Sequence, residues 1–169
     1  MHRATEQVLV AQAESFLKQF AAHGTTTVEV KSGYGLSVAA EIKILKAIRT
    51  LARKSRVELV PTLLAAHALP AEFKRRRQKY LELITQRLIP AVRRHRLAEF
   101  VDCFCDRGAF TEKECRAVLD AGRRYGLIPR IHAEQISHTG SCLLATTLDA
   151  ASADHLDHIT RAEIRALAR

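Results

Sequence analysis

The sequence predicts an α/β fold with a parallel sheet, in the form of an incomplete (β/α)8 barrel. Short β-branched or apolar segments alternate five times with longer segments of helical periodicity. Each pair of successive strands is separated by enough residues for a crossover helix, as in right-handed βαβ units. Polar residues follow the end of every predicted strand, which favours a barrel. A doubly wound sheet is the alternative, but no Gly-x-Gly-x-x-Gly follows the first strand.

The first quarter of the chain predicts a helix, a strand and a second helix. Apolar residues recur at helical spacing over residues 4–22, and Gly24 ends that helix. The β-branched segment 25–30 predicts a strand. Ser37 can cap the amphipathic segment 38–54, which predicts the second helix.

The same alternation continues through the middle of the chain. Residues 57–64 predict a strand, and residues 71–94 predict one long basic helix. Residues 100–105 predict the third strand. Thr111 followed by Glu114 forms a capping box, which marks the start of a further helix.

The last third predicts two more strands and two more helices. The helix that starts at the capping box ends near Gly126, and residues 127–132 predict the fourth strand. Residues 137–148 predict a helix and residues 150–154 a short fifth strand. Thr160 can cap a final amphipathic helix.

Length and composition describe one globular domain. A closed eight-stranded barrel needs about 250 residues, whereas this chain has 169, of which 47% are hydrophobic and 27% charged. The start of the chain has no hydrophobic signal core, and no apolar run is long enough to cross a bilayer. The four cysteines include no Cys-x-x-Cys pair, so we expect reduced, mostly buried thiols in a cytoplasmic chain.

The formal net charge of +9 comes largely from residues 74–79 and 93–96. Charge alone would fit a nucleic-acid-binding module. No aromatic interleaving, helix-turn-helix or RNA-binding signature accompanies these residues, so we expect a solvated helix face instead.

His132 and His155 end the fourth and fifth predicted strands and are the central candidates for a site. Imidazole is a common ligand of catalytic zinc or iron, and it also transfers protons near neutral pH. Two imidazoles at successive strand ends therefore suggest a metal-assisted or acid–base site, although each could instead bond only to nearby backbone. The polar residues at the strand ends are Lys31, Tyr34, His67, Asp106, His132, Glu134, Gln135, Asp154 and His155.

Two further candidates precede these histidines. Tyr34 lies between two glycines that allow a sharp turn and could present its hydroxyl group to a ligand, or it could be an ordinary loop tyrosine. His67 follows an apolar strand and could contact a ligand or be a hydrogen-bonded core residue. Asp106 could be functional or could only shape a turn. Surface roles are assigned to His23, His95, His138 and His158.

Six segments together resemble the imidazolonepropionase family of the amidohydrolase superfamily. They follow one another in the order that the family has and cover nearly the whole chain, which makes the combination specific. The segments are Gly24–Leu36, Ala66–Ala68, Val101–Cys105, Gly108–Phe110, His132–Gln135 and Ser152–Leu156.

The resemblance implies a TIM-like barrel of the metal-dependent amidohydrolase type that opens the ring of 4-imidazolone-5-propanoate to give N-formimino-L-glutamate, in histidine breakdown. By the resemblance, His132 matches a ligand of one zinc or iron ion. His155 matches the histidine near the attacking water and substrate, and Gln135 a substrate or water hydrogen bond. Tyr34 and His67 match residues that contact the substrate. Family members are commonly homodimers.

The family's His-x-His pair, its metal-binding aspartate and its carboxylate-binding arginine have no counterpart in this sequence. The resemblance therefore implies that residues 1–169 are a single incomplete barrel segment, about strands two to six, that is truncated and inactive by itself. An open sheet of this kind has unpaired edges, so we expect the isolated chain to be marginally stable. The alternatives are another cyclic-amide amidohydrolase and the basic nucleic-acid-binding module.

Overall fold

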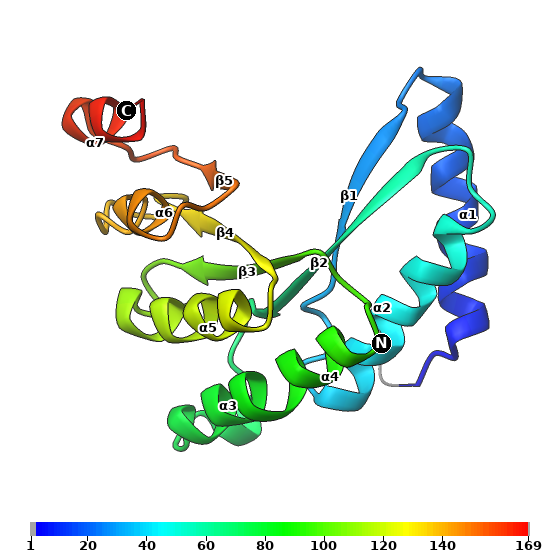
Figure 1. Ribbon diagram of the computed structural model, residues 1–169, viewed down its shortest axis with the longest axis horizontal. Coiled ribbons are helices and arrows are strands. Elements are labelled where there is room, and N and C mark those ends of the chain that lie inside the picture. The colour runs from blue at the N-terminus through cyan, green and yellow to red at the C-terminus, as the bar shows by residue number, and fades with distance from the viewer. Residues whose placement is uncertain (1–2, 169) are drawn as a thin grey trace.

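The computed structural model describes residues 3–168, and these contain one sheet of five parallel strands in the order β1-β2-β3-β4-β5. The strands are β1 Thr27–Lys31, β2 Glu58–Ala66, β3 Phe100–Cys105, β4 Ile128–Ala133 and β5 Ser152–His155. The sheet curls into part of a barrel, with helices along its outer side (Figure 1). The predicted incomplete (β/α)8 barrel is confirmed. Residues 1–2 and 169 of the predicted segment lie outside the described residues.

Helices connect the strands much as the sequence predicts. Helix α1 Glu6–Ala22 precedes β1, and α2 Val38–Ala52 connects β1 to β2. Helix α5 Glu112–Arg124 connects β3 to β4. Two short helices, α6 Leu143–Thr147 and α7 Arg161–Leu167, precede and follow β5. No helix within residues 3–168 has the length and apolar character that crossing a membrane requires.

The prediction of one helix over residues 71–94 is wrong. The segment is divided into a 3-10 turn Ala71–Phe73, helix α3 Arg77–Leu83, a π-helical turn Ile84–Leu88 and helix α4 Ile89–Arg94. Pro90 in the first turn of α4 explains the last division. Proline has no N–H to donate to the preceding turn, and a π-helical turn before it absorbs the resulting misfit.

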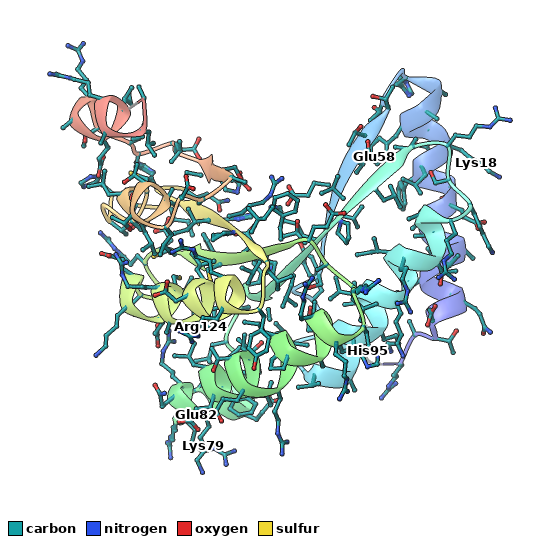
Figure 2. The ribbon with its side chains drawn as sticks, viewed as in Figure 1. Lys18, Glu58, Lys79, Glu82, His95 and Arg124 are labelled. Carbon is teal, nitrogen blue, oxygen red and sulfur yellow. The ribbon has the colours of Figure 1, made fainter. Side chains whose placement is uncertain are left out.

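The basic side chains of this segment form the solvated face that the sequence suggests. Lys74, Arg75, Arg76 and Lys79 are exposed. Lys79 and its neighbour Glu82 point away from the sheet (Figure 2).

The predicted helix over residues 137–148 is also too long, because only Leu143–Thr147 is α-helical. Residues 134–142 form a loop instead, since the carboxylate of Glu134 accepts hydrogen bonds from Thr139, Ser141 and the backbone N–H of Cys142. Bonds of this kind compete with the helical pattern of backbone hydrogen bonds.

The core lies between the sheet and the outer helices. On β3, Val101, Cys103 and Cys105 alternate toward α5, where Cys115 is also fully buried. All four cysteines are buried and free, and burial raises the pKa of Cys142 to about 11. The inner face is polar by contrast, and the side chains that meet there are Glu29, Lys31, Thr62, Asp102, Arg130, His132 and Asp154.

The N-terminus of α5 is held by the predicted capping box. The side chain of Thr111 accepts from the backbone N–H of Glu114, whose carboxylate accepts from the backbone N–H of Thr111 at 2.8 Å. The same carboxylate receives two hydrogen bonds, of 2.8 and 2.7 Å, from the guanidinium of Arg77 on α3. These bonds to Arg77, followed by those to Thr111, hold the pKa of Glu114 at about 2, against an ordinary value of 4.5.

We expect Glu114→Gln to lower the free energy of unfolding by about 1–2 kcal/mol at neutral pH, a figure reduced because Arg77 is partly exposed. A carboxylate with a lowered pKa contributes stability above pH 4.5 and loses it as the pH falls toward 2. Urea unfolding of dilute protein, followed by circular dichroism, should therefore show the two proteins converging in this range. The control is Glu112→Gln, whose side chain is exposed. A difference independent of pH would contradict the assignment.

Both edges of the described sheet are open, because β1 pairs only with β2 and β5 only with β4. Unpaired strand edges offer backbone groups to other chains. We expect the purified chain to self-associate, with a mass by light scattering after size exclusion that exceeds one chain and rises with concentration. A monodisperse monomer that melts cooperatively would contradict this expectation.

Candidate functional site

A partly buried ion-pair network, centred on the fully buried Asp102, occupies the inner face of the sheet. The Lys31 ammonium on β1 lies 2.7 Å from a carboxylate oxygen of Asp102 on β3 and 3.1 Å from one of Asp154 on β5. A third carboxylate, that of Glu29, lies 2.9 Å away. Burial acts to lower the pKa of Lys31, but the attraction of Asp102 and hydrogen bonds to Asp102 and Glu29 outweigh it and raise that pKa. The ammonium is therefore the cation that balances these carboxylates.

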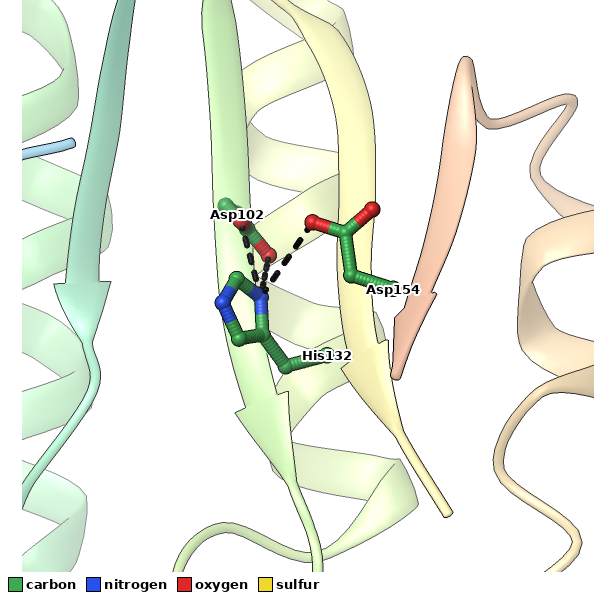
Figure 3. A group of neighbouring side chains, drawn as sticks. All are labelled: Asp102, His132 and Asp154. Atoms are coloured by element: carbon green, nitrogen blue, oxygen red, sulfur yellow. Dashed lines mark hydrogen bonds and ion pairs between the residues drawn. The ribbon is translucent and has the colours of Figure 1, made fainter. Parts of the chain in front are cut away.

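His132 on β4 joins this network through one ring nitrogen. Its Nδ1 lies 3.1 and 3.0 Å from the two carboxylate oxygens of Asp102, and 3.8 Å from the nearest oxygen of Asp154. Nε2 lies on the side of the ring away from both carboxylates (Figure 3). A histidine whose Nδ1 meets a carboxylate and whose Nε2 is turned away has the arrangement of metal-binding histidines.

Asp102, His132 and Asp154 each offer a ligand atom within 4.8 Å of the others, which is close enough for a shared metal ion. Lys31 already contacts both carboxylates, so a metal ion among these three residues would have to displace its charge. The carboxylates therefore serve the lysine and the histidine ring, and the free side of His132 is the better candidate for a metal.

A second charged layer lies next to Lys31. Glu29 accepts a 2.6 Å hydrogen bond from the Thr62 hydroxyl and lies 3.5 Å from Nε of Arg130. The guanidinium of Arg130 lies 4.0 Å from the centroid of the Phe100 ring, a cation–π contact. This layer fills the inner face below the candidate site and so supports Lys31.

Aromatic rings form a row across the carboxyl ends of the strands. Tyr34 and His67 meet edge to face with centroids 5.1 Å apart, and His67 is 6.2 Å from Phe104. Phe104 is 6.4 Å from His132, which is 5.1 Å from His155. The four aromatic residues predicted for the site, Tyr34, His67, His132 and His155, thus belong to one series of neighbouring rings, and Phe104 is an additional member.

Glu41 on α2 holds the loop that carries Tyr34. Its carboxylate is fully buried and accepts backbone hydrogen bonds from Gly33 and Gly35 at 2.7 Å and from Leu36 at 2.8 Å. Gly33 has a φ of 101°, and a Cβ there would collide with the backbone of β2, so only glycine fits. Tyr34 is consequently 60% exposed at the tip of a fixed turn.

Asp106 and Glu134 hold the loop that carries Gln135. Asp106 accepts from the backbone N–H groups of Gln135 at 2.9 Å and Ile136 at 2.8 Å, and from the Ser137 hydroxyl at 2.7 Å. Burial works to raise the pKa of Asp106, but these donors outweigh it and lower the pKa. Asp106 therefore joins the loop after β3 to the loop after β4. Gln135 itself is half-buried beside this junction.

Glu134, His138 and Glu163 form a second group with ligand atoms close enough for a metal ion. Glu134 is occupied by its own loop, and Glu163 accepts two short hydrogen bonds from Thr160 at the start of α7. These bonds from Thr160, with a contribution from His138, hold the pKa of Glu163 at about 2. His138 is exposed, as the sequence predicts, and the group is a helix cap with a surface histidine.

The chain turns sharply after β5. His155 has φ of 74° and Leu156 has φ of 63°, both in the left-handed region that side chains rarely adopt. Two such residues in succession are strained and persist only where surrounding contacts fix them. Here they turn the chain so that the exposed His155 ring remains beside His132.

An open cavity of about 570 Å³ adjoins the row of rings. Its lining includes His67, Phe104 and Ile136, and also the basic residues Lys74, Arg77 and Arg107. A small ligand in contact with His67 therefore has positively charged side chains nearby.

Asp102, Glu41 and Phe104 belong to the site but were not predicted from the sequence. Asp102 alternates with two phenylalanines on one face of a strand, and a carboxylate in such a position was a signal that its charge is paired. Glu41 lies in the first turn of a helix, where glutamate is common for dipole reasons, so nothing marked it.

Comparison with known proteins supports the resemblance. No protein-family model matches the chain. An imidazolonepropionase of Myxococcus xanthus is 47% identical over 165 residues, which are 98% of this chain and 39% of that relative. An imidazolonepropionase of Bacteroides fragilis is 46% identical, over 95% of this chain and 39% of that relative. One of Geobacillus thermodenitrificans is 48% identical, over 90% of this chain and 36% of that relative.

The chain thus spans about two fifths of the length of these relatives, at 46–48% identity. The resemblance inferred from the six segments is confirmed.

We expect Glu41→Gln to release the turn that carries Tyr34. Its amide NH₂ group would face backbone donors in a buried position, and an unpaired buried group costs about 1–3 kcal/mol. Hydrogen exchange at Gly33, Gly35 and Leu36 should accelerate about tenfold or more. The control is Glu82→Gln, on an exposed face of α3. Unchanged exchange at these amides would show that Glu41 does not hold the turn.

Proposed function

We propose, from that resemblance, that this chain forms the central segment of an imidazolonepropionase barrel, corresponding to about strands two to six. The reaction proposed for the whole protein is hydrolysis of the cyclic amide C–N bond of 4-imidazolone-5-propanoate to N-formimino-L-glutamate, in the cytoplasm. By itself the chain would be inactive, because the remaining metal ligands and the carboxylate-binding arginine would come from the rest of the barrel. The small-molecule substrate is the only partner proposed for the site.

One observation supports the proposal above others. Tyr34, His67, His132 and His155, far apart in the sequence, lie in one row at the carboxyl ends of the strands. In (β/α)8 barrels the active site is built at this end, from residues of several strands. The spatial arrangement therefore supports the residue roles that the resemblance implies.

His132 suits the metal-binding role in this proposal. Its Nδ1 is held by Asp102, so Nε2 is the nitrogen that would bind a zinc or iron ion. Such an ion would supply Lewis-acid activation of a water molecule and of the ring carbonyl.

The other residues would bind the substrate and move protons. Tyr34 and His67, in contact with each other, would orient the planar ring through a few polar groups. Water oxygen adds to the carbonyl carbon, the C–N bond breaks, and the proton of the water reaches the ring nitrogen. His155, exposed beside His132, would carry that proton, and Gln135 would hold the water or substrate by a hydrogen bond.

The cavity beside His67 fits an anionic substrate. Lys74 and Arg107 line it and would attract the propanoate carboxylate toward the site. These two charges would raise the rate at which the substrate associates, more than they would fix its position once bound.

The test is turnover of 4-imidazolone-5-propanoate by the chain joined to the missing flanks of the barrel. We expect turnover in the joined protein, none in the 169-residue chain, and a loss of at least about a hundredfold in His132→Ala. His95→Ala, an exposed residue outside the site, serves as the control and should be fully active.

Absence of turnover in a folded, joined protein would overturn the assignment. Equal activity of His132→Ala and the parent would remove the ligand role. Turnover of a different cyclic amide alone would favour another amidohydrolase activity.

A further inference from the structure

We propose that Asp102 is a positioning residue that fixes the tautomer of His132, with the proton on Nδ1 and the lone pair on Nε2, and that Lys31 enforces this choice. The geometry of Asp102, Lys31 and His132 carries the inference. Its meaning for metal binding rests on the proposed function.

A carboxylate has no hydrogen to donate, so a ring nitrogen that bonds to it must carry the proton. His132 Nδ1 lies 3.1 Å from Oδ1 and 3.0 Å from Oδ2 of Asp102, while Nε2 lies on the opposite side of the ring (Figure 3). Asp102 is fully buried, so no water competes for its oxygens. Nδ1 is therefore the protonated nitrogen.

Lys31 holds one of the two oxygens of Asp102. Its ammonium donates to Oδ2 of Asp102 at 2.7 Å, the shortest contact that this carboxylate makes with either partner. An ammonium carries three donors and no acceptor, so it always claims an oxygen atom. In Asp102→Asn one oxygen would remain, and Lys31 would take it because a charged donor forms the stronger bond.

The side-chain amide in Asp102→Asn would have only one orientation. With the asparagine oxygen held by Lys31, its NH₂ group must face the histidine ring. Nδ1 of His132 would then have to accept, and the proton would move to Nε2. The substitution changes very little of the shape of the site but reverses which nitrogen has the lone pair, so a nitrogen able to bind a metal would no longer point to the open side.

Asp154 provides a matched control. It is an aspartate on the same face and donates no hydrogen either, but its nearest oxygen is 3.8 Å from Nδ1, beyond hydrogen-bond distance. Like Asp102 it contacts Lys31, at 3.1 Å, so Asp154→Asn also alters the charge around the lysine. We expect it to leave the tautomer unchanged.

The experiment is nitrogen-15 NMR of the histidine side chains in the 169-residue chain, at a pH where the imidazole is neutral. His132→Gln assigns the signals. In the parent protein and in Asp154→Asn, the downfield signal of an unprotonated nitrogen should belong to Nε2. In Asp102→Asn it should belong to Nδ1.

A parent spectrum with the unprotonated signal at Nδ1 would overturn the inference, and it requires no variant to fold. Retention of the parent tautomer in folded Asp102→Asn would also overturn it. These results are separate from those for the reaction. If His132 has the predicted tautomer but the joined protein does not hydrolyse 4-imidazolone-5-propanoate, the role of Asp102 stands and the proposed function is wrong.

Discussion

A single ammonium group joins the first strand of the sheet to the last. Lys31 on β1 and Asp154 on β5 lie at opposite edges of a five-stranded sheet, yet their charged atoms are 3.1 Å apart. Side chains of a flat sheet could not meet across three intervening strands, given a spacing of about 4.8 Å between neighbours. The ion pair can therefore form only because the sheet is curled. Curling brings the charged side chains of the inner face together, so these charges must pair with one another. A partly buried pair of this kind specifies geometry more than it adds stability.

Carboxylates take the place of regular structure at the site end of the sheet. Glu41 and Asp106 accept backbone N–H groups from the loops after β1 and β4, and Glu134 fixes the segment that follows its own strand. Loops have no repeating backbone hydrogen bonds, so their N–H groups need other partners when they are buried. The result is a set of fixed loops after β1 and β4, which carry Tyr34 and Gln135.

Much of this arrangement could be predicted from the sequence because it depends on local patterns. Alternation of strand and helix periodicity predicted the parallel sheet, and Ser37 and Thr111 marked helix starts that the structure confirms. Parallel strands end at one edge, so His132 and His155 were expected to lie together. The π-helical turn before Pro90 and the loop after Glu134 depended on competing hydrogen bonds that periodicity does not register. The partners of Asp102, which are Lys31 and His132, lie on two other strands, and no spacing in the sequence reveals them.

The burial of all four thiols has a practical consequence. Cys103, Cys105, Cys115 and Cys142 are all buried, and the pKa of each thiol is raised. Burial is the main cause for Cys103 and Cys142, whereas for Cys105 and Cys115 the main cause is a hydrogen bond with another thiol, to which burial adds, so little reactive thiolate forms. Alkylating reagents would reach these sulfur atoms only when the sheet separates from its helices. The rate at which these thiols are alkylated therefore reports how often the core opens, and mass spectrometry could measure it without an added label.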